Sequence, residues 1–367
     1  MNKFKIGDNM PQDTISVNLI EDTVKLDSIG YYNPLLIYKS EVFKEGHFVL
    51  DVSSFRKTLE SIEIKQKFKA DEDKRKVASE EYEFLSASCS DFFAEGGLKS
   101  FDFFIYRDIK VVVEFLTKNI HPFVVFVNSL QENFAEACNL VKGIAKFVVF
   151  STKLKILPEF LDVLPVSQRD GVILMYDSGS DNLHLKFIAK YLHEANIFHA
   201  TNPYGMTLRS KPVYDATLIS ELRRNNINFY SLLNETGRDG VLAFKEGVDC
   251  AGRSIDEMFT YYLLKNEATR ELIHIWNGNN RQNSKLSQLK FSDGKPNAYT
   301  AGLECLFKEF KERGLIVSFG DIKFGLKADN VLGLSLSIRI KYNDSFKSVV
   351  LNIGSDDIND YLRREAD

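Results

Sequence analysis

The stretch that decides the fold begins at Gly240 and ends at Ile316. Residues 240–276 read GVLAFKEGVDCAGRSIDEMFTYYLLKNEATRELIHIW and residues 296–316 read PNAYTAGLECLFKEFKERGLI. Each block predicts one amphipathic helix, because its apolar residues recur at helical spacing. These residues are Ile255, Phe259, Tyr262, Leu272, Ile273 and Trp276 in the first block and Leu303, Leu306, Phe307 and Phe310 in the second. Gly314 stands where a helix C-terminal cap is expected. Two apolar helix faces so close together require other elements to cover them, and neither block offers catalytic chemistry.

Composition indicates a folded protein of two or three domains. Of its 367 residues, 44% are hydrophobic and 12% aromatic, which is ample for a packed core. The net charge is −4 and no basic stripe is present, so we expect no nucleic-acid partner. A short mixed-charge run, DEDKRK at 71–76, is typical of a solvated loop or helix end.

The sequence gives no sign of a membrane or disulfide-stabilised protein. No run approaches 18 apolar residues and the N-terminus lacks the apolar core of a secretory signal, so we expect no membrane insertion. The cysteines stand apart from one another with no CxxC pair, which favours single thiols in a reducing compartment over a disulfide framework or zinc site. They are Cys89, Cys138, Cys250 and Cys305.

The middle of the chain predicts an α/β domain with a mixed, mostly parallel sheet. Short β-branched and aromatic runs alternate there with amphipathic segments, as in a sheet covered on both faces. The runs lie at 101–106, 122–128, 146–150, 171–177 and 227–233, with helical segments near 109–118, 131–142, 154–164, 182–195 and 212–224. Before them, residues 31–52 predict two further strands, and Ser53 and Ser54 precede a short predicted helix.

Both ends of the chain carry strand patterns that lack a neighbouring partner. Ile15, Val17 and Leu19 alternate with polar residues, so their partner strand comes from far along the chain or from another chain; a disordered tail is the alternative. Residues 332–342 alternate apolar and polar side chains, Asn343 and Asp344 favour a turn, and residues 348–353 form a last predicted strand. Such a two-stranded ribbon leaves open edges that invite pairing with another chain.

Catalytic and cofactor-binding signatures are absent from the sequence. It contains no GxxxxGK[ST], no GxGxxG after a strand, no HExxH and no GxSxG. Asp177 and Asp181 follow a predicted strand, where an α/β enzyme or small-molecule binding protein carries its site, but these residue types also favour a turn and a helix cap. His184, His193 and His199 do not share one helix face, so no metal site is expected.

The order of the elements after residue 226 resembles the C-terminal domain of contractile phage tail sheath proteins, particularly those of divergent, spirochaete prophage-like elements. In that family a small-residue step opens a long helix, as Gly252-Arg253 and Ile255-Asp256 do here. A second helix ends in a glycine-led turn, here Arg313-Gly314-Leu315, and the chain closes with a pair of strands. The resemblance covers residues 226–353 directly and residues 30–226 by architecture.

The resemblance implies a structural subunit that polymerises around a tail tube and contracts to drive the tube through the host envelope. It implies no enzyme activity and no cofactor. The implied partners are other copies of the chain in rings and helical arrays, the tail tube protein, and the baseplate and tail terminator proteins. The implied location is the phage tail, with the host cytoplasm during assembly.

The resemblance also divides the chain and assigns its contact residues. It implies an N-terminal arm over 1–30, an α/β domain over 31–225, a sheath-type C-terminal domain over 226–345 and a C-terminal arm over 346–367. The arms are expected to pair with a neighbour's sheet through backbone hydrogen bonds. Their candidate interface residues are Ile15, Val17 and Leu19 in the first arm and Val349, Leu351 and Ile353 in the second. Lys308, Lys311 and Glu312, on the charged face of the second helix, are candidates for the tube-facing surface; a plain solvated face is the alternative.

Overall fold

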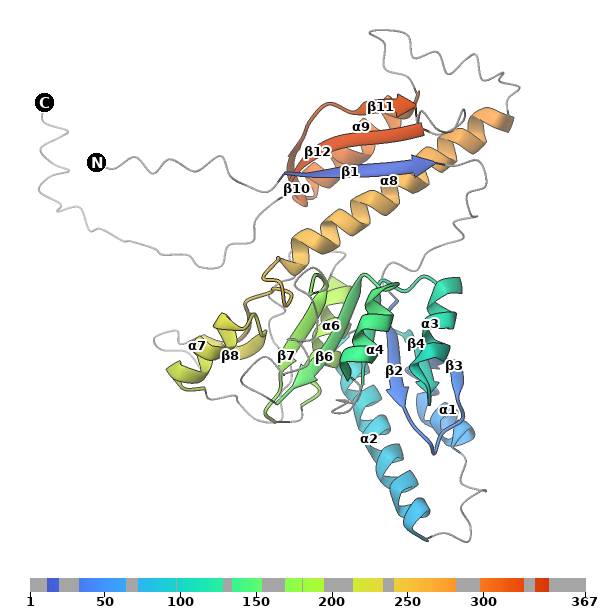
Figure 1. Ribbon diagram of the computed structural model, residues 1–367, viewed down its shortest axis with the longest axis vertical. Helices are drawn as coiled ribbons and strands as arrows, with labels where there is room; N and C mark the ends of the chain where they lie inside the picture. Colours follow the sequence, from blue (N-terminus) through green and yellow to red (C-terminus); the bar gives the residue numbers. More distant parts are fainter. Residues whose placement is uncertain are drawn as a thin grey trace, which may run out of the picture.

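The computed structural model confirms the α/β class, with a mostly parallel sheet and a C-terminal unit of helices and strands (Figure 1). A long helix, α8, joins the two parts in the figure. The structure describes residues 12–19, 33–63, 72–96, 98–127, 134–153, 169–179, 181–194, 214–233, 241–281, 298–326 and 334–342.

The larger sheet has six strands in the order β3-β4-β2-β5-β6-β7. Every neighbouring pair is parallel except β3 and β4, so β3 is an antiparallel edge strand. The strands are β2 (Leu35–Lys39), β3 (Gly46–Asp51), β4 (Ser100–Tyr106), β5 (Phe123–Phe126), β6 (Phe147–Thr152) and β7 (Val172–Tyr176). Because the chain leaves β2 first toward β4 and then crosses back to β5, the parallel strands have the doubly wound arrangement with a switch point at β2 and β5.

Helices cover both faces of this sheet, which explains the continuous apolar runs in its strands. One face packs against α1 (Phe55–Ile62), α2 (Glu72–Gly96) and α6 (Leu183–Glu194). The opposite face packs against α3 (Ile109–Lys118), α4 (Phe134–Lys142) and α7 (Ala216–Arg224). The two faces take alternate residues of each strand: Leu36 belongs to the first core and Leu35 to the second. In the DEDKRK run the described side chains Glu72, Asp73, Arg75 and Lys76 are exposed at the start of α2, in agreement with the predicted solvation.

The run at 227–233 is not a further strand of the parallel sheet, which corrects the sequence-based interpretation. It forms β8 (Phe229–Leu233), which pairs antiparallel with β9 (Val241–Lys245) in a separate two-stranded sheet. A single parallel bridge from Asn228 to Met175 connects it to β7. The buried Asn228 amide holds the segment at this bridge, because its Nδ2 donates to the carbonyls of Leu174 in β7 and Val248.

The helices that open the sequence analysis are present as α8 (Ile255–Arg281) and α9 (Ala298–Glu312). Ile255, Phe259, Tyr262 and Leu272 are buried on α8 as predicted, and so are Leu303, Phe307 and Phe310 on α9. Gly314 has φ +75°, the left-handed conformation expected of a residue that ends a helix. The side chains of Ile273 and Trp276 lie outside the described set.

The C-terminal sheet joins both ends of the described chain. β12 (Leu334–Tyr342) pairs antiparallel with β1 (Gln12–Leu19) on one side, and with β10 (Ile316–Phe319) and β11 (Lys323–Leu326) on the other. Within the described residues β12 therefore lies in a four-stranded sheet in which both of its edges are occupied. Residues 348–353 lie outside the described part of the chain.

The partner of the N-terminal strand comes from far along the same chain, which is one of the two expected alternatives. Ile15 pairs with Ile338, Val17 with Leu336 and Leu19 with Leu334. β1 has its partner on one side only within the described residues, so it forms an edge of this sheet (Figure 1).

The loop between β9 and α8 attaches the long helix to the α/β body. Asp249 is buried and accepts hydrogen bonds from the backbone N–H groups of Gly171, Ala251 and Arg253 at 2.7–3.0 Å. Burial raises the pKa of Asp249, and these three donors act in the opposite direction. A side chain at Gly171 would meet the Lys146 carbonyl at 2.2 Å, and its φ is +72°, so this close contact requires glycine.

Candidate functional site

The carboxyl ends of β2 and β5 are where a doubly wound sheet carries its ligands. After β2, the buried Ser40 hydroxyl donates to Glu81 at 2.5 Å and accepts from the backbone N–H groups of Val42 and Phe43. Burial raises the pKa of Glu81, whereas the hydrogen bond from Ser40 lowers it. The described hydrogen bonds of the Ser40 hydroxyl are thus made within the turn that follows β2 and with Glu81 of α2.

Asp177, at the carboxyl end of β7, has the geometry of a helix-capping residue. Its Oδ1 accepts from the Asp181 N–H at 3.0 Å and its Oδ2 from the Leu183 N–H at 3.1 Å, directly before α6. Asp177 and Asp181 are both buried, at 5% and 3% exposure. The structure therefore brings the two residues together, in the turn-and-cap arrangement that the sequence left as an alternative to a ligand site.

His184, the second residue of α6, is held neutral by its surroundings. It is 1% exposed, and its Nε2–H donates to the carbonyl of Phe126, since a carbonyl can only accept. Burial lowers the pKa of His184 to about 4, against the opposing effect of Asp177. Its Nδ1 has no hydrogen-bond partner.

The described residues offer neither a metal site nor a membrane span. Within them, no three His, Cys, Asp or Glu side chains are arranged to bind a metal ion. Of the three histidines that the sequence analysis weighed, only the His184 side chain is described. No described helix is both long and apolar enough to cross a lipid bilayer.

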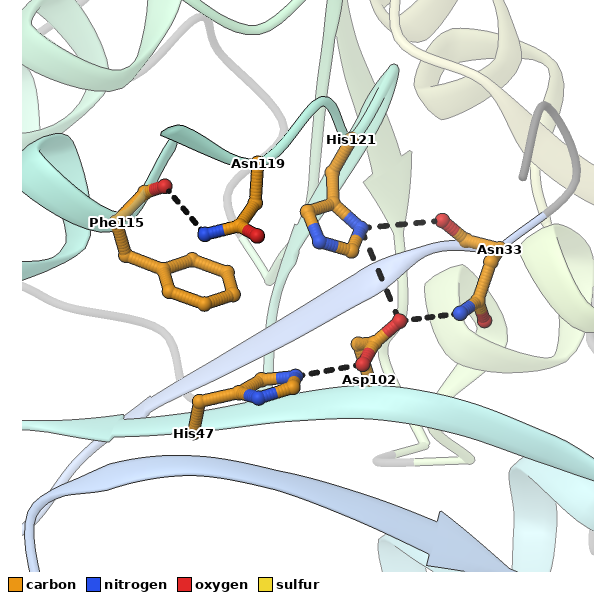
Figure 2. A network of polar contacts seen from close by, with 6 residues as sticks. All are labelled: Asn33, His47, Asp102, Phe115, Asn119 and His121. Carbon is orange, nitrogen blue, oxygen red and sulfur yellow. Dashed lines mark hydrogen bonds and ion pairs between the residues drawn. The ribbon is translucent and has the colours of Figure 1, made fainter. Parts of the chain in front are cut away.

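A polar cluster that the sequence analysis missed lies at the opposite, amino edge of the sheet (Figure 2). Asp102 of β4 accepts from His47 Nε2 at 2.5 Å and from Asn33 Nδ2. His121 Nδ1 lies 4.0 Å from the second Asp102 oxygen and 3.4 Å from the Asn33 carbonyl. The Asp102 and His121 side chains are only 12% and 10% exposed, against 33% for His47. Phe115 of α3 stacks on both imidazoles, with ring centroids 4.7 Å from His47 and 5.7 Å from His121.

One sequence signal pointed to this cluster. Asp102 interrupts the apolar run SFDFFIY of β4, and a carboxylate buried in a sheet requires donors. His47 at the start of β3 and Asn33 supply these donors, and His121, just before β5, places its Nδ1 4.0 Å from the carboxylate. The strand order β3-β4-β2-β5 decides which residues lie near Asp102, and this order could not be predicted from the sequence.

The candidate contact residues of the sheath hypothesis fall into three sets, which lie in different parts of the chain. Ile15, Val17 and Leu19 lie in β1 on the C-terminal sheet. Lys308, Lys311 and Glu312 are exposed on α9, as either a tube-facing surface or a solvated face requires. Val349, Leu351 and Ile353 lie outside the described residues.

Comparison with known protein families divides the chain in two. The model of the DUF787 N-terminal domain matches residues 10–252, and that of the DUF787 C-terminal domain matches residues 255–366. The chain belongs to the DUF787 family. No curated protein matches it.

The boundary between the two DUF787 domains falls in the loop that carries Asp249. The first domain, residues 10–252, therefore includes β1, although β1 pairs with β12 of the second domain. The resemblance implied a boundary at 225/226, before β8, whereas Asn228, Asp249 and Cys250 bind the β8–β9 segment to β7 and to Gly171 just before it. In this chain the first strand thus crosses from one domain to the sheet of the other.

The cap geometry of Asp177 leads to a prediction. Asp177→Ala is expected to lower the free energy of unfolding by about 1–2 kcal/mol, because two N–H groups at the start of α6 lose their acceptor. Chemical denaturation followed by circular dichroism measures this. Asp108→Ala is the control: the exposed Asp108 side chain caps α3 by accepting a single hydrogen bond, from the Lys110 N–H. Its loss is expected to lower the free energy of unfolding by less than Asp177→Ala does. An Asp177→Ala protein as stable as the wild type would contradict the capping role.

Proposed function

We propose that the chain is a structural subunit of a contractile phage tail sheath. In this proposal copies of the chain polymerise around a tail tube, and contraction drives the tube through the host envelope. Tail tube, baseplate and tail terminator proteins are its partners, and the virion tail is its location. The proposal rests first on the sequence resemblance of residues 226–353 to sheath C-terminal domains.

The observation that supports it best is the placement of β1. This strand forms an edge of the C-terminal sheet, and residues 20–32 separate it from the α/β body. Those 13 residues can span at most about 45 Å. A β1 that moved to the β12 of a neighbouring copy would regain the same eight residue pairs, so the exchange costs little in hydrogen bonds. Such an exchange would link subunits in a closed, repeating assembly.

The polar groups at the carboxyl edge support a structural role rather than an enzymatic one. Ser40 and Asp177 hold the backbone of a turn and a helix start. An enzyme or small-molecule binding protein with a site near Asp177 and Asp181 would need these oxygens free for its ligand. The substitution Asp177→Ala separates the two functions. A protein with a ligand site at Asp177 should lose ligand binding, whereas a sheath subunit should still assemble.

Electron microscopy of the purified full-length protein tests the proposal. We expect rings, tubes or short cylinders at high protein concentration, either alone or with the tail tube protein as template. Light scattering after size-exclusion chromatography gives the oligomeric state in the same preparation. A protein that remains a monomer or dimer at every concentration, with and without the tube protein, would refute the sheath proposal.

Removal of the C-terminal arm gives a second prediction. Deleting residues 346–367 is expected to abolish assembly while leaving the circular dichroism and melting temperature of the α/β body unchanged. Val349→Asp combined with Leu351→Asp is the matched point variant, because charges on the apolar face of this predicted strand would prevent its burial. Asp356→Ala with Asp357→Ala serves as the control and should assemble normally. Tubes formed by the truncated chain would disprove the role of this arm.

A further inference from the structure

β3 leaves one edge of the six-stranded sheet open within the described part of the chain (Figure 1). It pairs with β4 on one side and is the last strand in the order of this sheet. Val49, in the middle of β3, is 58% exposed, and Val52, directly after the strand, is 47% exposed. Edge strands commonly carry a lysine, a proline or a bulge that prevents pairing with another chain. The sequence of β3, GHFVLD, contains neither residue type, and its register with β4 is continuous.

The backbone groups of β3 that face away from β4 can be assigned from the ladder between the two strands. The N–H of Val52 donates to the carbonyl of Lys99 at 2.9 Å and continues this ladder by one residue pair. Residues of an antiparallel strand turn their N–H and C=O groups alternately toward one neighbour and away from it. His47, Val49 and Asp51 therefore direct these groups to the open edge.

We propose that two copies of the chain associate through their β3 strands, antiparallel about a two-fold axis at Val49, so that their two six-stranded sheets become one. In this register Val49 lies opposite the partner's Val49, and His47 lies opposite the partner's Asp51. It brings all three outward-facing residues of each strand opposite an outward-facing residue of the other. Every other register leaves two such pairs or fewer, so the backbone favours this one.

The side chains also suit a strand that pairs with itself. Two exposed valines meet at the axis, with their Cα atoms about 5.5 Å apart, and each covers apolar surface of the other. On either side of the axis the imidazole of His47 lies opposite a carboxylate, that of Asp51 in the partner, so no like charges face each other. A register centred on Asp51 would place two carboxylates opposite one another. This two-fold complementarity indicates a second copy of the chain as the occupant of the edge.

Both ends of the proposed contact are held in place before the copies meet. His47 Nε2 donates to Asp102 at 2.5 Å, and the Asp51 carboxylate accepts from the N–H and the hydroxyl of Ser53. The Asp51 carbonyl accepts from the Ser54 N–H at 3.0 Å, and a carbonyl oxygen can accept a second hydrogen bond. Little side-chain or backbone order therefore has to be gained on association, which favours binding.

Disulfide crosslinking of the full-length protein tests the register. The exposed Cys305 is first replaced by serine, because Cys89, Cys138 and Cys250 are buried. With oxidised glutathione, Val49→Cys should then form a covalent dimer at least tenfold faster than Val52→Cys. Two residues 49 lie opposite each other, within the range of a disulfide, whereas two residues 52 lie about 20 Å apart along the paired strands. Equal rates in the two variants would indicate random collision and overturn the contact.

Sedimentation velocity measures the strength of the association. We expect a concentration-dependent dimer in the wild type and a dissociation constant at least tenfold higher in Val49→Lys, because two like charges then lie opposite each other. The control Val317→Lys makes the same change at a 43% exposed residue of β10 and should leave the dimer unchanged. A wild type that is monomeric at every concentration, or a dimer that survives Val49→Lys, would overturn the proposal. So would a dimer that is lost when residues 346–367 are deleted, since the C-terminal arm would then be the occupant.

The β3 contact needs only the α/β body, so it goes beyond the sheath proposal and stands or falls separately. A protein that gives the Val49 crosslink but never forms rings or tubes would retain the β3 contact and refute only the sheath proposal. Rings or tubes formed by a protein that gives no such crosslink would refute only the β3 contact.

Discussion

Replacing Phe259 with alanine is expected to lower the free energy of unfolding by about 3–5 kcal/mol. Phe259 is 3% exposed and projects from α8 into the core of the α/β body. Its ring centroid lies 5.3 Å from that of Phe123, 6.1 Å from that of Phe147 and 5.6 Å from that of Tyr191. The substitution removes the ring and leaves a cavity between the sheet, α6 and α8. The surrounding side chains are held by the sheet and the helices, so they fill this cavity only in part.

Urea denaturation followed by circular dichroism measures this loss. Phe84→Ala is the matched control, since the same change at a side chain that is 39% exposed on α2 should cost far less. Equal losses in the two variants would contradict the role of Phe259. Helix α8 also contacts α9 and β1, so it links the C-terminal unit to the α/β body. Because Phe259→Ala weakens this link, the variant should unfold in two transitions, one for each part.

The elements of the α/β body could be predicted from the sequence because a strand buried on both faces contains a continuous apolar run. The runs at β4, β5, β6 and β7 contain almost only apolar residues, and Asp108 and Asp215 stand as caps before α3 and α7. The buried stripe of α8 followed from its spacing in the same way. The local pattern of apolar residues is sufficient to predict a helix or strand that is buried on one face or on both.

The pairing of strands that are far apart in the sequence could not be predicted from local patterns. The alternation in β1 and in β12 predicted two strands, but nothing in either pattern fixes Gln12 opposite Lys341. The same limit explains the error at 227–233, where the apolar composition fits a buried strand of any sheet. The buried Asn228, which determines how this segment attaches to β7, resembles an ordinary turn residue in the sequence.

The candidate sites show a similar division. The cap formed by Asp177 is local, so the sequence offered it as one alternative, and the hydrogen bonds to Asp181 and Leu183 agree with it. The polar cluster at Asp102 depends on strand order, since the residues around its carboxylate, Asn33, His47 and His121, lie 69, 55 and 19 residues away along the chain. Only the charge in the middle of β4 was visible beforehand.

Acid is expected to destabilise the fold through His184, and His184→Gln should remove this effect. The imidazole is neutral in the folded protein because burial lowers its pKa to about 4. In the unfolded chain it takes up a proton below about pH 6.5, so the unfolded state binds more protons between these values and stability falls as the pH falls. Integrated from pH 6.5 to 4, the loss amounts to about 3 kcal/mol.

The measurement is the difference in unfolding free energy between wild type and His184→Gln at pH 7 and at pH 4.5. Taking the difference removes the contributions of His121, Glu81 and Asp249, which titrate in both proteins. A glutamine amide has a donor for the Phe126 carbonyl and no titration in this range, so the variant should lose less stability in acid than the wild type. His274→Gln, exposed on α8, should follow the wild type. Parallel acid losses in wild type and His184→Gln would mean that the buried imidazole is not the group that makes the fold sensitive to acid.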